Sequence, residues 1–96
     1  MSAVITPQAR QDLVEILRRI QDDNPLAAEK MAEEFIKKFR LLSAFPGIGT
    51  AQKNSDLGVL PVKHNYRVHY RVPPPELRIE RVVHVARNWS GEGLPA

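Results

Sequence analysis

The second half of this 96-residue sequence holds the side chains whose types and spacing could do chemistry. Arg67, His69 and Arg71 alternate with apolar residues, and this period of two predicts a β-strand with all three on one face. Guanidinium groups bind phosphates and carboxylates, and an imidazole can exchange a proton near neutral pH. Further candidates follow toward the C-terminus: Arg78, His84, Arg87 and the aromatic Trp89.

Each of these residues also has a plain structural interpretation. Arg67 and Arg71 could form the solvated face of a half-buried strand. His84 stands between two valines, where a lone histidine is more often a hydrogen-bonded structural residue than a general base. Trp89 is expected to pack at the edge of the core rather than to stack on the bases of a nucleic acid. The three histidines lack the tight spacing of a metal site, and the sequence has no cysteine, so we expect neither a metal nor a cofactor.

Two helices precede the strands that would carry these side chains. Thr6-Pro7 is typical of a helix start, with Thr as the N-cap and Pro as the first helical residue, and Asn24-Pro25 repeats the signal. Apolar residues follow each start at helical spacing. The first helix is predicted to end at residues 21–23 and the second before residues 45–49. Because so few residues separate the helices, they must fold back as a hairpin.

Strand signals lie on both sides of the helical hairpin. Residues 3–5 suit a short strand, residues 47–58 are predicted to be a loop, and further strands are predicted over 59–62, 66–72 and 77–85. The order β-α-α-β-β-β predicts an α+β fold with a helical hairpin packed on a mostly antiparallel sheet. Residues 1–96 would form one domain, with residues 90–96 as a flexible tail. Tyr66 and Tyr70 are expected in the core.

The last predicted strand contains a charge conflict. If the two final strands pair across their proline-rich turn without irregularity, Arg67 lies opposite Val82 and Arg81 falls on the apolar face. An unpaired charge in that position is costly. Two solutions remain open: a carboxylate from the first helix, Asp12 or Glu15, or a β-bulge near Arg81.

The overall charge indicates a class of partner. The formal net charge is +3 and the estimated pI is about 9.6, which favours RNA, DNA or an acidic protein segment. The N-terminus has no run of signal-peptide type, and the apolar runs are too short to span a membrane. We therefore expect a cytoplasmic protein with no membrane partner.

Several segments, in this order and spacing, resemble the RelE/ParE toxin family. They are Ala9–Leu13 with Ile16 and Ile20, Asn24–Ala28, Phe45–Gly49, Asn65–Val72, and Ile79–Trp89. The resemblance covers nearly the whole chain. It implies the toxin of a type II toxin–antitoxin pair, held in a hetero-oligomer by an antitoxin whose C-terminal segment wraps around it.

The resemblance leaves two activities open. RelE-like members cleave messenger RNA in the ribosomal A site, and the resemblance would then make Arg67 and Arg87 catalytic candidates. His84 is a further catalytic candidate for that activity, although it does not occupy the family's position for an acid or base. ParE-like members poison DNA gyrase and do not cut nucleic acid. The basic strand and C-terminal tyrosine or histidine of RelE-like members are missing from residues 58–62 and 91–96. These departures favour a ParE-like toxin, with a RelE-like ribonuclease or an inactive binding module as alternatives.

The antitoxin or target would bind a basic surface of the sheet. Arginines there would meet the carboxylates of an acidic or amphipathic antitoxin segment. The residues predicted for this surface are Arg67, His69, Arg71, Arg78, Arg87 and Trp89.

Overall fold

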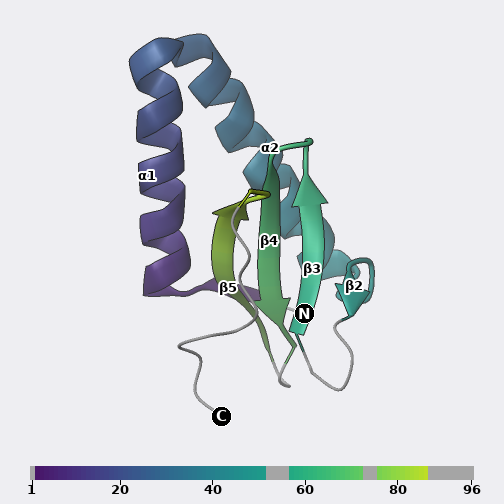
Figure 1. The fold of residues 1–96 in the computed structure, drawn as a ribbon. Helices are drawn as coiled ribbons and strands as arrows, with labels where there is room; N and C mark the ends of the chain where they lie inside the picture. The colour runs from purple at the N-terminus through teal and green to yellow at the C-terminus, as the bar shows by residue number, and fades with distance from the viewer. Residues whose placement is uncertain (1, 52–56, 73–75, 87–96) are drawn as a thin grey trace.

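The computed structural model describes residues 2–51, 57–72 and 76–86. Two helices cover one face of a five-stranded sheet (Figure 1), so the predicted α+β class is confirmed. The elements in chain order are β1 (Ser2–Ile5), α1 (Pro7–Asp23), α2 (Pro25–Ala44), β2 (Thr50–Ala51), β3 (Leu57–Val62), β4 (Tyr66–Arg71) and β5 (Glu76–His84). The tail predicted over residues 90–96 lies outside the described residues.

Both helices begin where their capping residues predict. The Thr6 side chain accepts a hydrogen bond from the backbone N–H of Ala9 at 3.1 Å, and Asn24 does the same for Ala27 at 3.1 Å. Asn24 also ends α1, because its N–H donates to the Ile20 carbonyl at 2.8 Å. One residue thus closes the first helix and opens the second, which makes the hairpin tight. Neither helix, within the residues described, is long and apolar enough to cross a membrane.

The sheet has the strand order β1-β5-β4-β3-β2. All neighbours are antiparallel except β1 and β5, which are parallel, so the first and last strands of the chain lie side by side. The sheet has one strand more than predicted, because Thr50 and Ala51, in the expected loop, pair with β3. A strand of two residues is too short to show the alternation of apolar and polar residues from which strands are predicted.

The third strand also begins earlier than predicted, because Gly58 is a strand residue and not part of a loop. A methyl group built on Gly58 would lie 2.4 Å from the Cζ atom of the Tyr70 ring. Glycine is therefore required for the close approach of this ring to the strand, and not for a turn.

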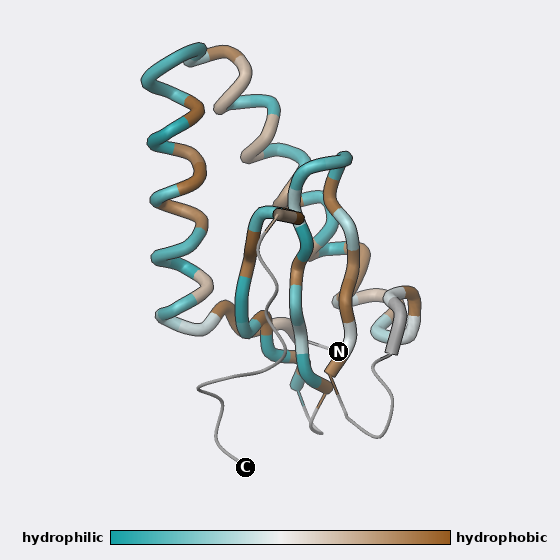
Figure 2. Tube along the Cα trace, in the orientation of Figure 1, coloured by the Kyte–Doolittle hydropathy of each residue, from teal (hydrophilic) through white to brown (hydrophobic). Residues whose placement is uncertain are grey.

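The core lies between the helical hairpin and the sheet. Tyr70 is buried in it, and Tyr66 packs against it with its ring edge-on to Phe35 at 5.8 Å, as expected for both tyrosines. Figure 2 shows that β3 is largely apolar, whereas β4 and β5 mix apolar and polar positions. Val68 and Tyr70 of β4, two residues apart, join this core from one face of the sheet. The buried cluster consists of Ala9, Phe35, Leu42, Leu60, Val62, Val68, Tyr70, Leu77, Ile79 and Val82.

A β-bulge in β5 resolves the charge conflict at Arg81. His69 pairs with Arg81 and Tyr70 with Ile79, so Glu80 is an extra residue in β5. The predicted register is corrected by one residue: Arg67 lies opposite Val83, not Val82.

The first helix supplies the partner that Arg81 needs. The Arg81 Nε donates to an Asp12 carboxylate oxygen at 2.8 Å. Both solutions left open by the sequence, a carboxylate from the first helix and a bulge, are therefore present together.

Candidate functional site

The face of the sheet turned away from the helices is its outer face, and both β4 and β5 place cationic side chains on it. Alternation along β4 sends Tyr66, Val68 and Tyr70 to the core, so the intervening residues occupy the outer face. The structure thus brings together three of the predicted binding residues: Arg67, His69 and Arg71. The neighbouring strand β3 places only apolar residues opposite them: Pro61, Val59 and Leu57.

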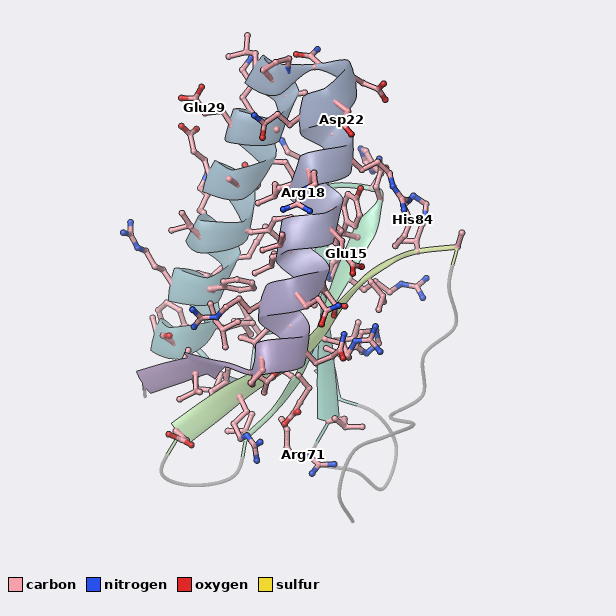
Figure 3. The ribbon with its side chains drawn as sticks, turned by 90° about the vertical axis from the view of Figure 1, so that its left-hand side faces the viewer. Glu15, Arg18, Asp22, Glu29, Arg71 and His84 are labelled. Atoms are coloured by element: carbon pink, nitrogen blue, oxygen red, sulfur yellow. The ribbon has the colours of Figure 1, made fainter. Side chains whose placement is uncertain are left out.

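A pair of like charges lies at one end of the outer face. Arg71 is directly opposite Arg78 of β5, and like charges in this arrangement repel each other. Arg78 has a carboxylate neighbour, with its Nε 3.5 Å from Glu80 Oε1. Figure 3 shows Arg71 at the end of the sheet far from the helix–helix connection. The pairing places two arginines side by side at this end of the sheet.

His69 contributes no positive charge to this face. Its side chain is buried, with 3% of its surface exposed. Burial, followed by the nearby charges of Arg67 and Arg81, lowers the pKa of His69 from 6.5 to about 4. The imidazole is therefore neutral at physiological pH, and it lies within the sheet between two arginines.

His84 and Arg67, proposed together for a RelE-like activity, lie on opposite faces of the sheet. His84 pairs with Tyr66 and meets its ring edge-on at 5.4 Å, which puts it on the side of the helices. Arg67 pairs with Val83 on the outer face. His84 Nδ1 also accepts a hydrogen bond from the backbone N–H of Ala86 at 3.1 Å. The structure does not assemble these two residues into one site.

Two other predicted site residues, Arg87 and Trp89, lie outside the described residues. Their predicted roles in target binding, and that of Arg87 in catalysis, remain predictions.

Asp12 fixes strand β5 to the first helix. Only 6% of its surface is exposed, and its carboxylate accepts hydrogen bonds from Arg81 Nε at 2.8 Å, from the Val82 backbone N–H at 2.9 Å and from Gln8 Nε2 at 3.1 Å. The parallel strand β1 pairs with β5 only as far as Ile79. The Val82 N–H lies beyond that pairing, and Asp12 accepts its hydrogen bond instead. This contact holds β5 and the bulge in position.

A pocket of about 110 Å³ lies between α1 and the end of the sheet where β4 begins and β5 ends. The residues lining it include Glu15 and Arg19, which are one helical turn apart, and Ile16, Tyr66 and His84. Figure 3 shows Glu15 and His84 on this side of the molecule. This pocket could not be predicted from the sequence, because its walls meet only through the long-range packing of α1 on the sheet.

Comparisons with known proteins agree with this architecture. A family model described as "ParE toxin of type II toxin-antitoxin system, parDE" matches residues 3–89. A solved structure described as "Chromosomal ParDE TA system from P. aeruginosa" superimposes with a TM-score of 0.77 at 24% sequence identity, over 88% of this chain and 96% of that chain. This second likeness shows a shared fold. A search of curated proteins finds no match.

Proposed function

The chain belongs to the ParE toxin family of type II toxin–antitoxin systems, and from this premise we propose that it arrests bacterial growth by poisoning DNA gyrase. It acts in the cytoplasm until a cognate antitoxin binds it in a hetero-oligomer and neutralises it. The observation that carries the proposal is the family match, which extends over residues 3–89.

The geometry of the outer face supports binding rather than RNA cleavage. Cleavage at a 2′-OH needs an acid or base within reach of the phosphate that an arginine holds. Among the described residues, the histidine beside Arg67 is His69, which is buried and has a pKa of about 4. The exposed His84 lies on the other side of the sheet. These positions favour a toxin that acts through protein contacts.

The arginines of the outer face support the antitoxin part of the proposal. A carboxylate from a partner placed between Arg71 and Arg78 would be attracted to both guanidinium groups. Acidic residues of an antitoxin segment supply such carboxylates. We therefore assign neutralisation to this end of the outer face.

The test is to induce the full chain in a bacterial host and to follow DNA and messenger RNA together. We expect filamentation, an SOS response and intact messages, and with purified gyrase we expect cleaved plasmid DNA that depends on added toxin. Co-expression of the antitoxin should abolish both effects. Cuts at ribosomal A-site codons would instead establish the RelE-like alternative, and continued growth would leave only an inactive binding module.

A further inference from the structure

The last residues of β5 leave one edge of the sheet uncovered on the side of α1. Within the described residues, β1 is the strand on that edge, and it pairs only with residues 76–79. The Val82 N–H points out of this edge, since Asp12 accepts its hydrogen bond at 2.9 Å. The Val85 N–H points to the opposite side, where it donates to a backbone carbonyl at 2.8 Å. Because backbone polar groups alternate between the two edges of a strand, the Val82 carbonyl and the His84 N–H also face the uncovered edge.

The pocket between α1 and the sheet lies along this uncovered edge. Val82, Val83 and His84 line it from β5, and Ile16 adds an apolar wall from α1. Its volume is about 110 Å³, and a water needs roughly 15 Å³ of such space, so about seven waters or a ligand with a similar number of non-hydrogen atoms would fill it. The pocket therefore suits a small metabolite rather than a drug-sized ligand, whose pockets measure about 300–1,000 Å³.

Two opposite charges of α1, Glu15 and Arg19, border the same pocket. A glutamate four residues before an arginine favours an ion pair on a helix surface, yet in the part of the chain that the structure describes no ion pair joins these two. Glu15 accepts a hydrogen bond from Gln11 Nε2 at 3.2 Å. The other carboxylate of the pocket, Asp12, is already held by Arg81. Glu15 and Arg19 thus offer one negative and one positive group to a ligand.

We propose that this pocket binds a free α-amino acid with a small aliphatic side chain. Its ammonium group would donate to the Val82 carbonyl and pair with Glu15. Its carboxylate would accept from the His84 N–H and pair with Arg19. A single residue of a parallel strand makes the same two backbone contacts, so the ligand would continue the pairing that β1 begins, with its side chain against Ile16.

The mixed charges of the pocket select this class of ligand. A simple anion attracted by Arg19 would be repelled by Glu15, and a simple cation would meet the reverse. An α-amino acid carries both charges on one carbon and satisfies both side chains, whereas a residue inside a peptide carries neither charge. The pocket lies on the helix side of the sheet, so this proposal rests neither on the antitoxin surface nor on gyrase.

The test titrates the full chain, labelled with ¹⁵N, with L-valine and two derivatives. We expect L-valine to shift amide signals in residues 15–19 and 82–84 and to leave the rest of the spectrum unchanged. N-Acetylvaline lacks the ammonium charge and valinamide lacks the carboxylate, so each should bind about tenfold more weakly or worse.

Glu15→Gln and Arg19→Gln should each weaken the binding of L-valine about tenfold. Asp22→Asn and Arg18→Gln are the matched controls, because they remove the same charges from exposed positions of α1 that do not border the pocket. Both controls should bind L-valine as the unmodified chain does, and the amide spectra of all variants must show the native fold. The comparison of the three ligands on the unmodified chain does not depend on any variant.

Three results would overturn the proposal. The first is the absence of localised shifts up to the solubility limit of L-valine. The second is binding of N-acetylvaline or valinamide as tight as that of L-valine, which would assign the pocket to one end of a peptide. The third is equal affinity of the pocket variants and their matched controls.

Discussion

Replacing Asp12 tests whether one carboxylate holds the last strand in place. In Asp12→Ala, the guanidinium of Arg81, 18% exposed, loses its ion pair, and the Val82 N–H loses its acceptor. Breaking a buried ion pair from one side costs about 3–5 kcal/mol, and an unsatisfied buried N–H costs about 1–3 kcal/mol. Because the two losses overlap at one site, we expect a total of about 4 kcal/mol. That is a large part of the roughly 5–15 kcal/mol by which small domains are stable.

Urea unfolding, followed by circular dichroism, measures this loss directly. Asp22→Ala is the control, because Asp22 is an exposed carboxylate on the same helix and its removal should change stability by no more than about 0.5 kcal/mol. The double variant Asp12→Ala/Arg81→Met removes both charges and should recover about 2 kcal/mol relative to the sum of the single losses. A loss below about 1 kcal/mol in Asp12→Ala, or a coupling near zero, would refute the view that this ion pair anchors β5.

Three further predictions follow from the sheet. The folded chain holds the pKa of His69 near 4 against an ordinary 6.5, so it binds fewer protons than the unfolded chain between these values. The contribution of His69 to the free energy of unfolding should therefore be fully present above pH 6.5 and fall by about 3 kcal/mol as the pH drops to 4. In urea unfolding at several pH values, His69→Gln should remove this part of the pH dependence. Gly58→Ala should lower the midpoint of thermal unfolding, because its methyl group would collide with the Tyr70 ring; an unchanged midpoint would mean that the ring moves freely. Arg71→Glu should weaken antitoxin binding, measured by titration calorimetry, about tenfold. Arg18→Glu makes the same charge change on the exposed face of α1 and should leave the binding unchanged. Equal effects of the two substitutions would mean that binding depends on net charge alone.

The elements that could be predicted from the sequence are those whose signals are local. Thr6 and Asn24 cap their helices through bonds to residues three positions away, so a short window of sequence contains the whole cause. The alternation in β4 likewise needs no knowledge of the rest of the chain. These signals were enough to predict the order of the helices and of the longer strands.

The details that could not be predicted depend on contacts between distant residues. The bulge at Glu80 lies next to a contact between Asp12 and Arg81, which are 69 positions apart, and the sequence offered a bulge and a carboxylate partner only as alternatives. The same bulge decides that His84 shares a face with Tyr66 rather than with Arg67. The placement of candidate catalytic residues thus required the structure.

The parallel pairing of β1 with β5 has a consequence for the synthesis of this toxin. The first strand emerges from the ribosome at the start of translation, but its neighbour in the sheet is the last strand to be made. The Thr6 hydroxyl can donate its hydrogen bond to the Glu80 carbonyl only after Glu80, 74 positions later, has been synthesised. At a synthesis rate of about 5–20 residues per second, this delay lasts several seconds. Until then, the helical hairpin has no finished sheet to cover. The nascent chain therefore completes its sheet only after residue 84 has been synthesised, which would leave the proposed antitoxin time to meet it.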